Sequence, residues 1–319
     1  MSNNINKHIW LIGAGQMAVD YYQVIKDQKI KCAVIGRGEL SARSFAKKTG
    51  FKPFVGGLNY FLKDKPNTCS HAIVAVGVEE LLKTTKKLLK YGIKNILVEK
   101  PAGINKEEIE KLSKKTKKNN ANVFVAYNRR FFTSVIKARE IIEKDGGVTS
   151  FNFEFTEWAH EVENIKNMHE VKKNWFLANS THVVDLAFYL GGNPKEISCY
   201  TEGSLEWHPS ASIFSGAGIS ETGALFSYQA NWESAGRWCV DVLTKNNKLI
   251  FLPLEKLQVQ QKGSVNIDLV KDIDYSLDKK YKPGIFLQVK AFLKTKKFGL
   301  LDIYEHARNC EIYERINGR

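Results

Sequence analysis

A glycine-rich turn near the N-terminus constrains the fold of this chain more than any other feature. An apolar run at residues 8–12 is typical of a buried strand, and apolar residues between positions 17 and 25 recur at helical spacing. Between them lies the pattern Gly-x-Gly-x-x-Ala, from Gly13 to Ala18. A strand and a helix joined by such a turn form a dinucleotide-binding fingerprint. The sequence therefore predicts a nucleotide-binding sheet at the start of the chain.

Each residue type in this turn has a physical role. Gly13 permits the tight turn, Gly15 lets the backbone approach a pyrophosphate, and Ala18 is small enough for the helix to pack on the strand. Amide groups at the helix N-terminus donate to phosphate oxygens, and the helix dipole favours negative charge there. The predicted cofactor-binding residues of this turn are therefore Gly13, Gly15, Gln16 and Met17.

Segments with strand-like and helix-like periodicity alternate through the first 126 residues. Apolar runs at 31–35, 71–76, 93–98 and 123–126 predict further strands of a parallel sheet with right-handed crossovers. Beyond residue 126, two-residue periodicity indicates a largely antiparallel sheet. We therefore expect an α/β protein with a dinucleotide-binding domain at 1–126 and an α+β domain at 127–319.

Composition narrows the class of protein. A chain of 319 residues, with 43% hydrophobic and 26% charged residues, is long enough for two globular domains. Its five cysteines are dispersed, without a Cys-x-x-Cys pair, which favours reduced thiols over disulfides or a metal site. Residues 1–4 lack the basic-then-apolar design of a signal peptide, and no apolar run is long enough to span a membrane. We expect a cytoplasmic protein that binds neither metal nor membrane.

The formal net charge of +14 has two interpretations. Nucleic-acid binding is one of them. The lysines, however, concentrate on predicted helix surfaces at 83–90 and 111–118, without interleaved aromatic residues. Solvated helix faces explain this pattern better, so we expect no nucleic-acid partner. A basic surface would still favour an anionic small-molecule substrate, phosphorylated or linked to a nucleotide.

The end of the second predicted strand bears on the choice of cofactor. An acidic residue there would bind the adenosine ribose and repel a 2′-phosphate, but this chain has glycine at position 36, followed by Arg37. Arg37 can pair with a 2′-phosphate, with Ser41 close behind, so we expect NADP(H) to be preferred over NAD(H). Glu39 is the counterargument, because a different turn would bring its carboxylate to the ribose.

A second motif, Glu-Lys-Pro at residues 99–101, follows the apolar run at 93–98. Proline removes a backbone donor and biases Lys100 toward extended geometry, so this lysine is held in place. A Lys-Pro pair at a strand end is, by itself, also typical of an ordinary turn. Paired with the upstream glycine turn, it suggests an active site at the mouth of the sheet.

Four motifs in this order resemble the glucose–fructose oxidoreductase / inositol dehydrogenase / rhizopine-catabolism (Gfo/Idh/MocA) family. They are the glycine turn, Val-Glu-Lys-Pro-Ala-Gly at 98–103, Tyr-Asn-Arg-Arg-Phe at 127–131 and His-Val-Val-Asp at 182–185. The resemblance implies an N-terminal Rossmann domain and a C-terminal domain with an open, mostly antiparallel sheet. It also implies hydride transfer between a nicotinamide cofactor and a hydroxyl or carbonyl carbon of a sugar-type substrate. A homodimer or homotetramer, associated through the open sheet face, is expected.

The resemblance assigns roles to matching residues. Lys100 matches the lysine that hydrogen-bonds the reacting oxygen, and His182 matches the histidine that exchanges a proton with that oxygen. Pro101 helps to shape the nicotinamide site, and Glu99 is expected beside the cofactor. Asp185 is expected to orient the catalytic site or to contact substrate, with a purely structural role as the alternative.

Further residues are expected to contact substrate. Asn128 and Arg129 lie where the two domains should join, and the arginine would suit an anionic substrate. The alternative is that this segment ties the domains together through ion pairs. Asn179 can hydrogen-bond a substrate hydroxyl.

Two positions depart from the family pattern. Many members have an aspartate four residues before the histidine, where this chain has Ala178. Many members also have Pro-Asn and a nearby histidine after the third strand, where this chain has Gly-Val-Glu-Glu at residues 77–80. Two other functions therefore stay open. The chain could be a catalytically silent sensor that binds a nicotinamide cofactor, or an enzyme without net redox turnover that retains its cofactor.

Overall fold

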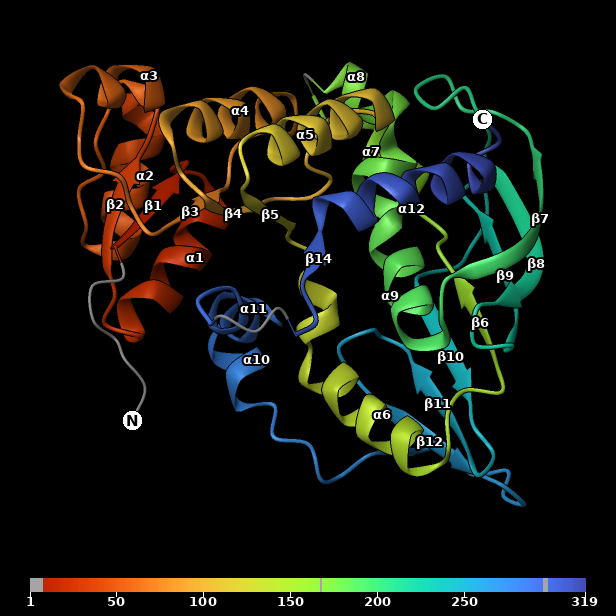
Figure 1. The fold of residues 1–319 in the computed structure, drawn as a ribbon. Coiled ribbons are helices and arrows are strands. Elements are labelled where there is room, and N and C mark those ends of the chain that lie inside the picture. Colours follow the sequence, from red (N-terminus) through yellow and green to blue (C-terminus); the bar gives the residue numbers. More distant parts are fainter. Residues whose placement is uncertain (1–7, 167, 295–297) are drawn as a thin grey trace. The chain divides into compact units, whose positions relative to one another are not determined.

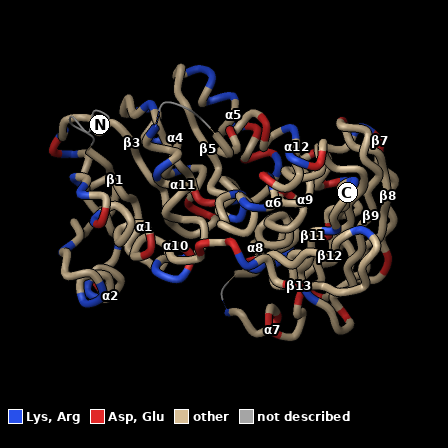
Figure 2. The backbone as a smooth tube through the Cα atoms, turned by 90° about the horizontal axis from the view of Figure 1, so that it is seen from below, with Lys and Arg blue, Asp and Glu red and all other residues tan. Residues whose placement is uncertain are grey.

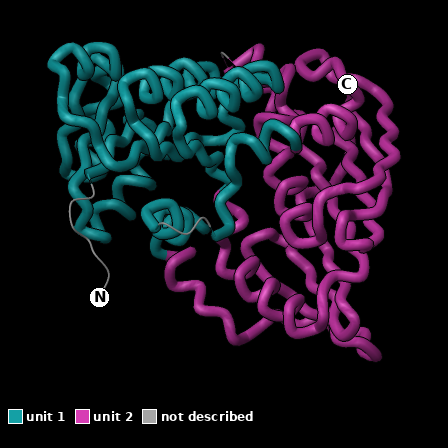
Figure 3. The backbone as a smooth tube through the Cα atoms, viewed as in Figure 1, with its two compact units in different colours: residues 1–127, 280–308 teal, residues 128–279, 309–319 magenta. Residues whose placement is uncertain are grey.

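The computed structural model describes residues 8–166, 168–294 and 298–319. Residues 1–4, considered above for a signal peptide, lie outside this part of the chain. The chain divides into two compact units (Figure 3): unit 1 comprises residues 1–127 and 280–308, and unit 2 comprises 128–279 and 309–319. The predicted division at 126/127 did not include the return of residues 280–308 to the first unit.

Unit 1 is built on a six-stranded sheet with the strand order β14-β5-β4-β3-β1-β2 (Figure 1). The strands are β1 (His8–Ile12), β2 (Lys31–Ile35), β3 (His71–Val74), β4 (Asn95–Val98), β5 (Asn122–Val125) and β14 (Leu301–Asp302). All neighbouring pairs are parallel except β14 with β5. This sheet confirms the predicted Rossmann-like architecture.

Helices cover both faces of this sheet, with α1 and α11 on one side and α4 and α5 on the other (Figure 1). The helical segments of unit 1 are α1 (Gln16–Asp27), α2 (Glu39–Thr49), α3 (Gly57–Phe61), η1 (Leu62–Asp64), η2 (Val78–Glu80), α4 (Leu81–Tyr91), α5 (Lys106–Lys118) and α11 (Ile285–Phe292). Helix α1 buries Tyr21, Val24 and Ile25, the residues of its predicted apolar face. Helix α2 begins at Glu39, so Glu39 and Ser41 lie in its first turn.

The return of the chain to unit 1 has a physical basis in two contacts. Helix α11 packs against α1, where the Tyr21 hydroxyl lies 3.4 Å from Oε1 of the buried Gln288. The short strand β14 pairs with β5 and so extends the sheet at that edge. Both elements belong to a region of the sequence without a glycine-rich fingerprint, which explains why the sequence pattern did not assign it to the first domain.

Unit 2 is built on an eight-stranded sheet with the order β13-β12-β11-β10-β6-β9-β8-β7. The strands are β6 (Ser150–Glu154), β7 (Pro194–Glu202), β8 (Ile213–Ser220), β9 (Leu225–Asn231), β10 (Cys239–Leu243), β11 (Asn247–Phe251), β12 (Gln258–Gln261) and β13 (Asp268–Leu269). Only β6 and β9 pair in parallel, which confirms the predicted, mostly antiparallel sheet.

The helical segments of unit 2 include one π-helical turn, η4. They are η3 (Asn128–Phe131), α6 (Thr133–Lys144), α7 (Ala159–Glu163), α8 (His169–Lys173), η4 (Phe176–Ser180) and α9 (Thr181–Gly191), while α10 (Ser276–Lys280) and α12 (Ile303–Ile316) cross the division between the units. Helix α9 packs on β6 and β10. The approach is close, because a Cβ on Gly191 would lie 2.3 Å from the Phe151 ring. A glycine is therefore required at the end of α9.

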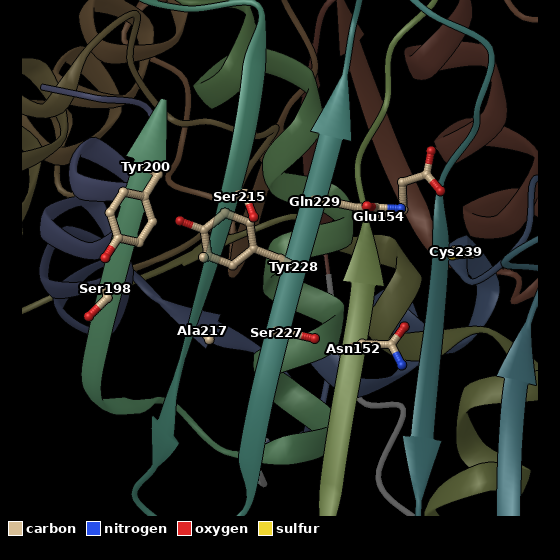
Figure 4. A pocket seen from close by; sticks show the side chains of 11 residues that line it. Asn152, Glu154, Ser198, Tyr200, Ser215, Ala217, Ser227, Tyr228, Gln229 and Cys239 are labelled. Atoms are coloured by element: carbon tan, nitrogen blue, oxygen red, sulfur yellow. The ribbon is translucent and has the colours of Figure 1, made fainter. Parts of the chain in front are cut away.

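The other face of this sheet carries small and polar side chains, which line a pocket of about 710 Å³ (Figure 4). The alternation of side chains along β8 explains the polar character of this face, because Ser215 and Ala217 are exposed while Phe214 of the same strand is buried. Among the described residues, no helix combines the length and the apolar character needed to cross a bilayer. Figure 2 shows that basic and acidic residues are interspersed along both units.

Candidate active site

The glycine turn in unit 1 has the geometry that its residue types predict. Gly13 adopts a φ of +128°, and a Cβ there would lie 2.1 Å from the carbonyl oxygen of Ala75. Its amide donates to the Ile35 carbonyl at 2.9 Å, which ties the turn to β2. Because both the backbone angle and the packing exclude a side chain, this position requires glycine.

Gly15 differs from Gly13 in its surroundings. It is the N-cap of α1, its backbone is extended, and nothing lies within 4 Å of the position a Cβ would take. The first turn of α1 follows, where Lys48 Nζ donates to Gln16 Oε1 at 2.6 Å and Lys282 Nζ lies 2.8 Å from the Met17 sulfur. Open space before a helix N-terminus, with ammonium groups beside it, fits the pyrophosphate of a dinucleotide.

The residues predicted to choose between NAD(H) and NADP(H) lie beyond β2. The Arg37 side chain is 82% exposed, and its Nη1 atom lies 3.5 Å from Glu80 Oε1. Glu39 instead pairs with Arg43 at 3.1 Å, and Ser41 Oγ donates to the Gly38 carbonyl at 2.9 Å. Thus the partner of Arg37 comes from η2, within the segment that departs from the family pattern.

Glu99, Lys100 and Pro101 directly follow β4. The Glu99 carboxylate accepts a 2.6 Å hydrogen bond from the Tyr21 hydroxyl on α1. Burial raises the pKa of Glu99, while the Tyr21 hydroxyl and the ammonium groups of Lys100 and Lys282 act in the opposite direction. The motif thereby adds one lysine and a restrained carboxylate to a region of unit 1 where Lys282 also lies.

Backbone hydrogen bonds on both sides of Lys100 hold the motif in place. The Glu99 amide donates to the Val74 carbonyl at 2.9 Å, and the Ala102 amide donates to the Glu99 carbonyl at 3.0 Å. The Pro101 carbonyl lies 3.0 Å from Nε2 of the buried His306, on α12. Lys100 itself is half-buried. Three hydrogen bonds of the neighbouring residues thus hold the main chain on both sides of Lys100.

His182 lies in the first turn of α9 in unit 2 and is 7% exposed. The centroids of the His182 and Trp238 rings are 6.3 Å apart. The guanidinium of Arg129 lies over the Trp238 ring at 4.9 Å, and that of Arg237 lies over the same ring at the same distance. Trp158 receives Arg237 as well, at 4.4 Å. The structure therefore brings His182 and Arg129 to one aromatic cluster.

Sequence reasoning missed Arg237 and Trp238 in this cluster. They precede β10 and carry no motif, and nothing in their spacing links them to residues 129 and 182. A third missed residue, Glu157, is 2% exposed and accepts hydrogen bonds from Asn179 Nδ2 at 3.0 and 3.1 Å. Glu157 is therefore a buried carboxylate beside a predicted substrate-binding residue.

Asp185 has a well-defined partner in unit 2. Its two carboxylate oxygens accept from Arg130, Oδ2 from Nε at 2.8 Å and Oδ1 from Nη2 at 2.6 Å. Both side chains are buried, and the Arg130 guanidinium also lies over the Tyr189 ring at 4.6 Å. A bidentate pair of this kind favours the structural alternative for Asp185. Asn128, predicted to contact substrate, is 7% exposed in η3.

Comparison with known proteins bears on the fingerprint in unit 1. Residues 7–127 match the profile of the Gfo/Idh/MocA oxidoreductase family, NAD-binding Rossmann fold. Over these residues the chain is similar to the NAD-binding domain of the Gfo/Idh/MocA family. The match confirms the predicted resemblance and the predicted enzyme class, an oxidoreductase that uses a nicotinamide dinucleotide. No curated protein has a matching sequence.

Solved structures of Gfo/Idh/MocA type share the fold over nearly the whole chain. Levoglucosan dehydrogenase, in complex with NADH, superposes with a TM-score of 0.77 at 16% identity, covering 98% of this chain and 97% of that one. UDP-N-acetylglucosamine 3-dehydrogenase from Acidithiobacillus ferrooxidans gives 0.72 at 12% identity, with coverage of 98% and 97%. A putative NADPH-dependent oxidoreductase from Desulfitobacterium hafniense gives 0.76 at 15% identity, with coverage of 98% and 94%.

Proposed function

We propose that this protein is an NAD(P)-dependent oxidoreductase that transfers a hydride to or from a hydroxyl or carbonyl carbon of a sugar or sugar derivative. The observation that carries the proposal is the fixed position of Lys100. It follows β4 in the same parallel sheet in which the glycine turn follows β1, so both lie beyond the carboxyl ends of their strands. Two of the similar folds, levoglucosan dehydrogenase and UDP-N-acetylglucosamine 3-dehydrogenase, act on sugars.

Lys100 and His182 share the proton chemistry in this proposal. The Lys100 ammonium donates to the reacting oxygen and stabilises the negative charge that develops on it. The His182 imidazole exchanges a proton with the same oxygen, as a group that titrates near neutral pH can. When bound, the nicotinamide supplies or accepts the hydride. Asp185 is assigned to neither step, since its carboxylate binds Arg130.

Replacement of Lys100 tests the proposal directly. Lys100→Ala should lower kcat by about 10²–10³-fold, the loss typical of removing one stabilising donor, with a cofactor Kd within about twofold of wild type. Lys90→Ala, which removes an exposed lysine of α4, is the matched control and should change neither quantity. Full turnover by a pure Lys100→Ala preparation would contradict the mechanism.

NADP(H) preference is a second part of the proposal. The exposed Arg37 guanidinium can leave its partner Glu80 for a 2′-phosphate, because a phosphate would form a stronger, bidentate pair with it. Glu39 supports the same assignment, since its carboxylate is engaged with Arg43.

Ala178 supports a rival function, a sensor that binds cofactor without turnover. This residue is buried in η4, at the position of the family aspartate, and alanine cannot accept a proton. A sensor would bind NADPH tightly and show no hydride exchange across a broad panel of sugars. Measurable turnover of a single sugar excludes it. A cofactor that survives purification and is not consumed in turnover would instead indicate the enzyme without net redox change.

Substrate charge and assembly complete the proposal. Arg129 and Arg237 both lie over the Trp238 ring, and their two guanidinium groups would suit an anionic group on the sugar. The concave face of sheet β13–β7 (Figure 4) is where we place contacts in a homodimer or homotetramer. Light scattering of wild type and of Ala217→Arg, a change on β8 within that face, tests the assembly. The cytoplasmic location stays a prediction.

A further inference from the structure

Glu157 is a buried carboxylate in unit 2 that the proposed chemistry does not use. It lies three residues beyond β6, and its side chain is 2% exposed. Its polar neighbours include Ser180, whose Oγ donates to it at 2.7 Å, Asn179, whose Nδ2 donates to both of its oxygens, and Arg237, whose Nη1 lies 3.9 Å away. Burial of an acid is costly, so these partners must offset a considerable desolvation penalty.

The contact with Glu157 determines which way the Asn179 amide faces. An ionised carboxylate can only accept hydrogen bonds, so it selects the NH₂ group of the amide and rejects the carbonyl oxygen. Since Nδ2 lies 3.0 and 3.1 Å from the two Glu157 oxygens, Oδ1 must point away from Glu157. Asn179 is half-exposed. It therefore turns its acceptor oxygen, Oδ1, away from Glu157 and toward any ligand of this site.

Asn179 lies in the π-helical turn η4 together with Ala178, directly before the helix of His182. π-Helical turns are often found at functional sites. Glu157 binds two consecutive residues of this turn, Asn179 and Ser180, and so fixes the backbone that leads into α9. On its other side, Arg237 links it to Trp238 and hence to the ring beside His182. The Glu157 carboxylate thus connects the η4 turn with the Arg237–Trp238 segment.

This inference rests on the proposed function. We propose that Glu157 is a positioning residue that fixes Asn179 as a neutral acceptor for a substrate hydroxyl, in place of the aspartate that Ala178 replaces. The Asn179 oxygen would accept from that hydroxyl but could not take up its proton, so proton transfer stays with Lys100 and His182. The site would select a polyhydroxylated substrate whose bound hydroxyl is free, and reject the analogue in which that hydroxyl is methylated.

The first experiment measures discrimination between hydroxyl and O-methyl groups. Wild type is assayed with levoglucosan, UDP-N-acetylglucosamine and other sugars, and then with mono-O-methyl analogues of the best substrate. One analogue should lose about tenfold in kcat/KM, the value of one hydrogen bond to a neutral acceptor. In Asn179→Ala and Glu157→Gln this preference should fall to about twofold.

The form of the loss separates positioning from general damage. Glu157→Gln should raise KM about tenfold with kcat within twofold, because the interaction it perturbs is made equally in the ground and transition states. Glu221→Gln, an exposed acid of the β8–β9 turn, is the matched control and should leave KM unchanged. An O-methyl preference that is undiminished in Glu157→Gln would overturn the proposal.

A second experiment does not depend on turnover. Melting temperatures of Glu157→Gln, Asn179→Ala and the double variant form a cycle, and the shift of the double variant should be clearly smaller than the sum of the single shifts. Additive shifts would overturn the contact on which the proposal rests. If no sugar is turned over, the proposed function fails by itself. The acceptor role then stands if a sugar raises the melting temperature of wild type but not of Glu157→Gln, and is overturned if no sugar does so.

Discussion

The candidate cofactor-binding residues of unit 1 and the candidate substrate-binding residues of unit 2 are held in different ways. In unit 1 the backbone defines the site: Gly13 and Gly15 shape a turn, and hydrogen bonds to the main chain hold Lys100. In unit 2, contacts between side chains define the candidate residues: Glu157 orients Asn179, and the guanidinium groups of Arg129 and Arg237 lie over the Trp238 ring. Backbone sites accept few residue types at fixed spacing. Side-chain sites can be assembled from any part of the chain.

The largest expected effect tests whether side-chain pairs hold unit 2 together. Asp185→Asn removes the charge partner of the buried Arg130 and should lower the free energy of unfolding by about 3–5 kcal/mol. Chemical denaturation followed by circular dichroism measures the loss. Replacing both partners, as Arg130→Met with Asp185→Leu, should recover most of it. Equal stabilities of wild type and Asp185→Asn would remove the structural role assigned to this pair.

The corresponding test in unit 1 compares its two glycines. Gly13→Ala introduces a Cβ against the Ala75 carbonyl at a positive φ, which should cost about 3 kcal/mol in the free energy of unfolding. Gly15→Ala meets no atom in the folded protein, so its stability should stay within about 0.5 kcal/mol of wild type. Isothermal titration should nevertheless show weakened NAD(P)H binding for Gly15→Ala. Normal cofactor affinity in this variant would place the pyrophosphate elsewhere.

A third test concerns His208, a fully buried residue of unit 2 whose Nδ1 lies 2.8 Å from the Ala211 carbonyl. Burial lowers the pKa of His208 to about 4, from 6.5. The contribution of the neutral His208 to the free energy of unfolding is thus fully present above pH 6.5. As the pH falls toward 4, the free energy of unfolding decreases by roughly 3 kcal/mol. Between pH 7 and 4, the melting temperature should depend less on pH for His208→Asn than for wild type. The exposed His160→Asn control should follow wild type.

The smallest expected effect is on cofactor choice. Arg37→Ala should weaken NADPH binding about tenfold, or roughly 1.4 kcal/mol, and leave NADH binding within twofold. Fluorescence titration with both cofactors measures the ratio. Because Arg37 is exposed, stability should not change, which distinguishes this result from that of Gly13→Ala. An unchanged NADPH affinity would remove the assignment of NADP(H).

These differences explain how far the sequence could be used. The turn from Gly13 to Ala18 and the strands β1 to β5 follow from local patterns, because a backbone site needs glycine and proline at set intervals. Glu157 and Trp238 could not be found in this way. They meet Asn179 and His182 through the packing of α9 on β6 and β10, and packing between distant segments leaves no local signal in the sequence.

Because β14 and α11 come from residues 285–302, the nucleotide-binding unit cannot be completed before these residues have been synthesised. A nascent chain that ends near residue 127 would leave the β5 edge unpaired and the α1 face around Tyr21 uncovered by α11. Unit 2 lies almost entirely between these segments, so most of it leaves the ribosome before unit 1 has all its parts. Removal of residues 280–308 should therefore damage the unit that is otherwise formed by residues before 128.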